Sequence, residues 1–219
     1  NILMKIANLY ARTGSNGKAL SNAEKALSLI PPSTPLSSGS FHSRVDGWLE
    51  STKGQYDRAS TYYQKALDAW TPSEGLPMKA TILSALADAQ TSSGDTDSAN
   101  RHYQESLDIW IKLNDVHNEA IIQYKLGAIW FEKTQYGLAS PFLKAAADNY
   151  RLLKRPQNEA HALSCLAVCY LNEQACNARN NRLSDIMERL EPLIGMLGNQ
   201  IADGRAYDAL SVVYGSRGQ

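Results

Sequence analysis

The chain has 219 residues, and its 22 lysines and arginines equal its 22 aspartates and glutamates in number. This balance excludes a strong overall field that would attract nucleic acid or an anionic membrane, and no apolar run approaches the roughly 20 residues of a membrane span. The odd count of 3 cysteines favours a reducing compartment, so we expect an intracellular protein, cytoplasmic or nuclear. The chain begins with Asn1 and not with methionine, so we expect a fragment of a longer protein.

Two helical stripes alternate along the chain at an interval of forty residues. The first stripe in each unit is mostly apolar, and the second carries small residues with spacings of three and four. The second stripe contains three sets of equivalent positions: Ala19, Ala59, Ala99 and Ala139; Ala23, Tyr63, Tyr103 and Leu143; and Ala26, Ala66, Ser106 and Ala146. Strands, whose side chains alternate with period two, cannot produce this pattern. The sequence therefore predicts an all-α chain of helix–turn–helix repeats.

In chain order, the predicted repeats form one α-solenoid. A single helix pair cannot bury both of its faces, so neighbouring pairs must stack. Gly14, Gly54 and Gly94 stand at equivalent turns, where a helix end commonly needs a left-handed residue. The expected helix pairs and the trailing single helix occupy residues 1–39, 40–79, 80–119, 120–159, 160–203 and 204–219.

Several positions depart from the repeat. Residues 31–40 read as a linker, and Asp46 stands where a large apolar residue is expected, so we expect that helix to be rotated or shifted. Pro141 predicts a second helix that begins late, with Ser140 as its N-cap. Pro192 predicts a kink or a break in the second helix of the fifth unit.

The repeat pattern resembles that of tetratricopeptide repeat (TPR) proteins. The stretches "IANLYARTGSNGKALSNAEKALSLIP", "GQYDRASTYYQKAL" and "LGAIWFEKTQYGLA" carry the resemblance. The forty-residue interval is similar to that of the long-helix TPR domains of kinesin light chains, Pins-type adaptors and Rap-type bacterial peptide sensors. The resemblance implies a right-handed superhelix whose first helices line a concave groove.

The resemblance also implies which side chains would contact a partner protein or peptide in that groove. Their positions lie on the first helices, one turn away from the packing stripe. The predicted groove residues are Asn8, Arg12, Phe41, Arg44, Trp48, Ser84, Asp88, Ile121, Tyr124, Phe131, His161, Ser164, Val168, Leu171 and Arg205. Some TPR proteins hold a chaperone's C-terminal carboxylate with a Lys/Asn/Arg set, but here only Asn8 fits that set, so we reject this function.

The sequence shows no catalytic, cofactor or metal constellation. His161, Cys165 and Cys169 share one helical stripe, but the first and last are about 12 Å apart on a straight helix, too far for one tetrahedral zinc ion. We therefore expect a non-catalytic interaction scaffold that binds no cofactor, metal, nucleic acid or membrane. Two alternatives stay open: a sensory or regulatory arm of a signalling or transcription regulator, and a recognition arm of an enzyme whose catalytic domain lies outside this sequence. The oligomeric state is also open.

Overall fold

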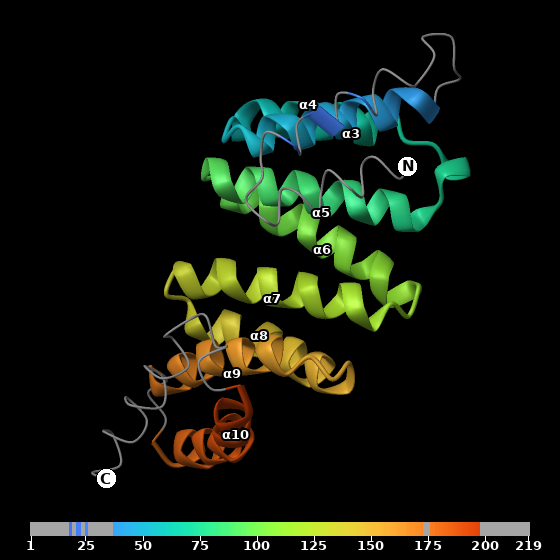
Figure 1. Cartoon of the computed structure of the whole chain (residues 1–219). Helices are drawn as coiled ribbons and strands as arrows, with labels where there is room; N and C mark the ends of the chain where they lie inside the picture. The colour runs from blue at the N-terminus through green and yellow to red at the C-terminus, as the bar shows by residue number, and fades with distance from the viewer. Residues whose placement is uncertain (1–17, 19–20, 23–24, 26–36, 173–175, 198–219) are drawn as a thin grey trace. The chain divides into compact units, whose positions relative to one another are not determined.

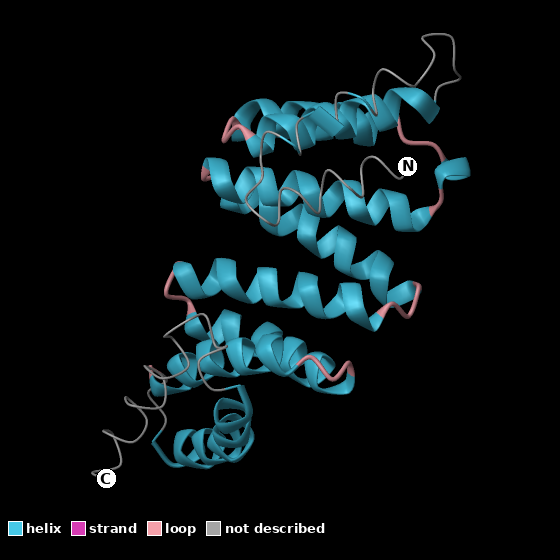
Figure 2. Ribbon diagram, in the orientation of Figure 1, coloured by secondary structure: helices cyan, strands magenta, loops and turns pink. Residues whose placement is uncertain are grey.

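Figure 1 shows a computed structural model of the chain, which describes residues 18, 21–22, 25, 37–172 and 176–197. The described part contains eight α-helices and one short 3-10 helix, and Figure 2 shows no strand among these residues. This confirms the all-α prediction for the described chain. Most of the predicted first pair, including Gly14, and the predicted trailing helix 204–219 lie outside the described residues. The helices are α3 (Ser37–Thr52), α4 (Tyr56–Asp68), η1 (Pro72–Glu74), α5 (Leu76–Ser93), α6 (Thr96–Lys112), α7 (Val116–Glu132), α8 (Tyr136–Leu152), α9 (Pro156–Leu171) and α10 (Cys176–Leu197).

The chain divides into two compact units, Asn1–Ile109 and Trp110–Gln219, with the boundary inside α6. In the first unit α3 packs on α4 and α4 on α5 (Figure 1). The hydroxyl of Ser106, on α6, donates to the carbonyl of Ala80, on α5, over 2.9 Å. In the second unit α7 packs on α8, α8 on α9 and α9 on α10. Within each unit, these described helices therefore pack chiefly on their neighbours in sequence, as in stacked helical repeats.

The three sets of equivalent positions predicted for the second helices are buried wherever the structure describes their side chains. Small residues on this stripe let the paired helices approach closely, while the larger ones fill the adjoining space. The prediction is confirmed at Ala59, Ala66, Ala99, Ser106, Ala139, Leu143 and Ala146, which have no exposed surface, and at Tyr63 and Tyr103, which are 6% and 3% exposed.

Two glycines of the first helices show how close this approach is. A Cβ atom added to Gly127 would lie 2.7 Å from Cγ of Leu143, and one added to Gly47 would lie 2.9 Å from the ring of Tyr63. The two contacts join equivalent positions, so α3 keeps the register of α7. The predicted rotation of α3 is therefore wrong. Asp46 is accommodated without it: the side chain is half-buried, and this burial raises the pKa of its carboxyl.

The late helix start predicted at Pro141 and the break predicted at Pro192 are wrong, whereas the kink named as the alternative at Pro192 stays a prediction. α8 begins at Tyr136 and includes Pro141, so Ser140 is not an N-cap. The missing N–H of Pro141 would have bonded the carbonyl of Gly137, four residues earlier, and both residues are exposed, so water can satisfy that carbonyl. α10 continues through Pro192 to Leu197 without a break.

The helix ends confirm the turn prediction at two positions and shift one boundary. Gly54 and Gly94 adopt positive φ of 76° and 92°, a conformation that costs glycine no steric strain. Thr134 holds the equivalent position in the next repeat, with φ of 56°. α3 begins at Ser37, so the end of the predicted linker 31–40 is helical.

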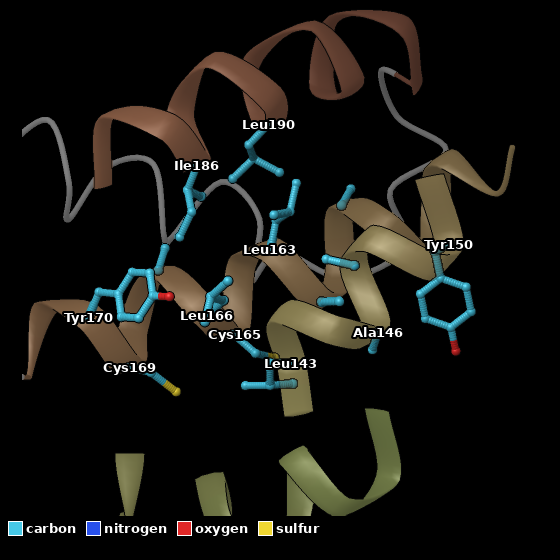
Figure 3. Packing of buried hydrophobic residues seen from close by; sticks show 14 of the residues in the cluster. Leu143, Ala146, Tyr150, Leu163, Cys165, Leu166, Cys169, Tyr170, Ile186 and Leu190 are labelled. Carbon is cyan, nitrogen blue, oxygen red and sulfur yellow. The ribbon is translucent and has the colours of Figure 1, made fainter. Parts of the chain in front are cut away.

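A core cluster of the second unit joins α8, α9 and α10 and also includes Ala120 of α7 (Figure 3). Side chains from the three helices interdigitate there, among them Leu143, Leu163 and Leu190. Beside this cluster, Arg189 of α10 donates to Glu159 of α9 over 2.9 Å and to Asp148 of α8 over 2.7 Å. The two ion pairs of Arg189 thus add to the apolar contact that α10 makes with α8 and α9.

Candidate functional site: two faces of the first helices

The described groove residues fall into two sets, one in each compact unit. The N-terminal face is formed by α3 and α5, and the C-terminal face by α7 and α9. The N-terminal face comprises Phe41, Arg44, Trp48, Ser84 and Asp88; the C-terminal face comprises Ile121, Tyr124, Phe131, His161, Ser164, Val168 and Leu171. Asn8, Arg12 and Arg205 lie outside the described residues.

Arg44 connects α3 to α5 on the N-terminal face. Its Nη1 donates to the sulfur of Met78 in the first turn of α5. The guanidinium carbon lies 5.7 Å from the ring centre of Phe41, one helical turn earlier, within the range of a cation–π contact. Trp48, one turn later, packs against the cluster that contains Tyr63. The face therefore presents a cation between two half-buried aromatic side chains.

The α5 side of the N-terminal face is polar. Ser84 is half-buried, and its hydroxyl donates to the carbonyl of Thr81 over 3.0 Å. Asp88 is exposed and accepts a hydrogen bond from the hydroxyl of Tyr103. Burial, together with the adjacent Asp88 carboxylate, raises the pKa of Tyr103, so the tyrosine stays a neutral donor. Asp88 is thereby held on the surface beside α6.

Tyr124 and His161 connect α7 to α9 on the C-terminal face. Their ring centres are 5.2 Å apart, with an interplanar angle of 54°, a tilted contact typical of aromatic pairs. Ile121, one turn before Tyr124, is half-buried, as are Val168 and Leu171 further along α9. The face is therefore aromatic and aliphatic, with part of its surface open to solvent.

Phe131 and Ser164, which were both predicted to contact a partner on the C-terminal face, instead contact neighbouring residues of the chain. The ring centre of Phe131 is 5.7 Å from that of Tyr136, so Phe131 packs into the α7–α8 turn. Ser164 is only 1% exposed, and its hydroxyl donates to the carbonyl of Ala160 over 2.7 Å. A partner on the described surface could not reach Ser164 without displacing its neighbours.

Arg44 and Tyr124 occupy equivalent positions, two forty-residue intervals apart, and each contacts the next first helix. The sequence prediction omitted Met78, the contact of Arg44, because the third unit was expected to begin at residue 80. α5 begins at Leu76, with a proline in its first turn. Proline at the start of a helix is common, so Pro77 was the signal that could have placed this boundary.

Two kinds of feature, a metal-type cluster and a membrane-spanning helix, are absent from the described residues. No group of three or more His, Cys, Asp or Glu side chains within them could hold a metal ion. Cys165 and Cys169, which share a helical stripe with His161, are both buried. Among the described helices, none combines the length and the apolar character needed to cross a membrane.

Comparisons with known proteins agree with this architecture. Residues 49–112 match the family model described as tetratricopeptide repeat. BtubC (BKLC) from P. vanneervenii has a similar structure, with TM-score 0.70 and 17% identity over 90% of this chain and 80% of that one. The kinesin light chain TPR-like repeats of Podosopora anserina give TM-score 0.64 and 14% identity over 90% and 95%.

A third similar structure is that of a gene regulator. The Rap conjugation gene regulator of the plasmid pLS20, in complex with the Phr* peptide, gives TM-score 0.65 and 16% identity over 97% of this chain and 56% of that one. No curated protein sequence matches the chain. Identities this low establish the fold alone. Residues 49–112 therefore match tetratricopeptide repeats in sequence, and the chain shares the fold of TPR-like repeat proteins over most of its length.

Proposed function

We propose that the chain is a non-catalytic protein-interaction scaffold that binds a segment of a partner protein on the faces of its first helices. The observation that carries this proposal is the C-terminal face. Tyr124 and His161 bridge successive first helices there, and apolar side chains stay half-exposed on both sides of the bridge. Partly buried aromatic residues of this kind are frequent anchors in protein interfaces.

The proposed partner segment is an extended or helical peptide. Its apolar side chains would cover Ile121, Tyr124, Val168 and Leu171, which would remove half-exposed apolar surface from water. The similar Rap regulator is in complex with the Phr* peptide; this likeness supports a peptide as the partner. It equally suits the alternative in which the chain is the sensory arm of a regulator.

Peptides selected from a random library on the whole chain would test the proposal. We expect the affinity of the selected peptides to fall at least about tenfold when Ile121→Ala and Tyr124→Ala are combined, since hot-spot residues often contribute about 2 kcal/mol each. Leu138→Ala is the matched control, because Leu138 is 51% exposed on α8 and outside both faces.

Fluorescence polarisation gives the affinities, and urea denaturation shows whether each variant still folds. Peptides that bind wild type and the double variant equally would place the site away from the C-terminal face. A library that yields no binder would overturn the proposed function itself.

A further inference from the structure

Arg44 is a half-buried cation to which no described carboxylate forms an ion pair. Its described contacts are the Met78 sulfur, a weak acceptor, and the face of the Phe41 ring. Neither neutralises a full positive charge. A guanidinium carries five N–H donors in a fixed fork, and the described neighbours of Arg44 use few of them.

Arg189, in the second unit, is an arginine whose positive charge is paired with carboxylates. It is also half-buried, but two carboxylates accept its hydrogen bonds, from Glu159 and Asp148. Burial by itself would lower the pKa of Arg189, yet the bonds to these carboxylates raise it. For Arg44 burial dominates and lowers the pKa, although attraction to Glu74 and Tyr63 opposes this. Charges removed from water are normally paired. Among the described residues, Arg189 has such a counter-charge and Arg44 has none within ion-pair distance.

Among the described carboxylates, the candidate counter-charge is Glu74, at the end of η1. Its carboxylate attracts Arg44, but no ion pair joins the two groups, and Oε1 of Glu74 is buried without a hydrogen-bond partner in the described structure. The other carboxylate of this face, Asp88, already accepts a hydrogen bond from Tyr103. The counter-charge for Arg44 is therefore not supplied by either residue.

We infer that Arg44 binds an acidic side chain, aspartate or glutamate, of a partner segment on the N-terminal face, while Phe41 and Trp48 contact the apolar side chains beside that acid. The inference rests on the proposed function and names the chemistry of its ligand. Arginine suits this task because its planar fork can hold a carboxylate through two parallel hydrogen bonds. The half-buried position strengthens the attraction relative to a fully exposed pair. Asp88, on the α5 side of the face, disfavours a second acid there, so the acidic side chain is directed to Arg44.

The test uses the peptides selected on the whole chain and asks whether they carry an acidic residue. For each acidic peptide, a counterpart with the acid replaced by its amide is synthesised. We expect Arg44→Gln to lower the affinity for the acidic peptide at least about tenfold, the effect of one charge-assisted hydrogen bond, and to leave the affinity for the amide counterpart unchanged. Arg44→Lys should recover part of the loss, since it restores the charge but not the fork.

Two control variants distinguish a specific contact at Arg44 from a general effect of charge on this unit. Arg58→Gln removes the same charge from the same unit, at an exposed position on α4 that pairs with Glu50 over 3.3 Å. We expect it to leave binding unchanged. Glu74→Gln removes the competing carboxylate, so we expect it to keep or raise the affinity for the acidic peptide.

The inference is overturned if the selected peptides lack an acidic residue, or if Arg58→Gln or Glu74→Gln weakens binding as much as Arg44→Gln does. Peptides that depend on Tyr124 but not on Arg44 would retain the proposed function and refute this inference alone. If no library peptide binds, both are refuted. Urea denaturation of each variant confirms that losses of affinity do not reflect unfolding.

Discussion

Replacing Gly127 with alanine tests the close approach between α7 and α8. The added Cβ would lie 2.7 Å from Cγ and 2.9 Å from Cδ2 of Leu143, and 3.2 Å from its backbone nitrogen. Cγ is the branch point of the leucine and not its flexible end, so the leucine or the helix must move. Overpacking of this kind costs about 1–3 kcal/mol. The substitution also gains up to about 1 kcal/mol, because alanine favours the helix interior, so the net loss of stability is about 0–3 kcal/mol.

A second glycine in the same hairpin separates the two effects. Nothing lies within 4 Å of a Cβ added to Gly137, near the start of α8. Gly137→Ala should therefore show only the helix preference and stabilise the protein by less than about 1 kcal/mol. The difference between the two glycine variants approximates the cost of overpacking.

A double-mutant cycle assigns that cost to Leu143. Leu143 has no exposed surface, and Leu143→Ala by itself should cost about 2–5 kcal/mol. In the Gly127→Ala background the same change should cost at least about 1 kcal/mol less, because the new methyl group then fills part of the vacated space. Urea denaturation followed by far-ultraviolet circular dichroism measures all four proteins, and hydrogen exchange in α7 and α8 checks for local unfolding, which repeat proteins allow. If Gly127→Ala proves as stable as Gly137→Ala, the assigned register of the hairpin is incorrect.

Two further predictions concern the ends of α7. Thr134→Gly should stabilise the chain by about 0.5–1 kcal/mol. Thr134 has a left-handed φ of 56°, and the strain that glycine relieves there outweighs the greater freedom of glycine in the unfolded state. A lower urea midpoint for the variant would contradict this. Asp115 caps α7 by accepting from the Asn118 N–H over 3.0 Å, and this bond, more than its other contacts, lowers the pKa of the carboxyl from 3.8. Asp115→Ala should therefore cost about 1 kcal/mol at neutral pH, and this cost should shrink as the pH falls below 3.8 towards the folded-state pKa, where protonation removes the charge. Urea titrations across that range measure it, and a cost that is independent of pH would show that the carboxylate is not the stabilising group.

The sequence by itself determined the repeat and its register. The forty-residue interval and the stripes of small and large residues correctly predicted which positions are buried, from Ala59 to Ala146, because helical periodicity fixes the face on which a residue lies. The same pattern predicted left-handed turns at Gly54 and Gly94. The rotation of α3 predicted from Asp46 was wrong, because the contact between Gly47 and Tyr63 keeps this helix in register. The late start of α8 predicted from Pro141 was also wrong, because water can satisfy the carbonyl that the proline leaves without a donor.

Only the tertiary structure decided what the face residues contact. Periodicity placed Arg44 and Tyr124 at equivalent positions, but it could not show that one contacts Met78 and the other His161, since these contacts depend on side-chain rotamers and on the spacing between helices. The burial of Ser164 likewise depends on the spacing between helices, which periodicity does not give. The contrast between Arg44 and Arg189 also required the structure, because the partners of Arg189 lie 30 and 41 residues away along the chain. Whether a buried charge is paired is set by the packing of separate helices, which a local sequence pattern does not encode.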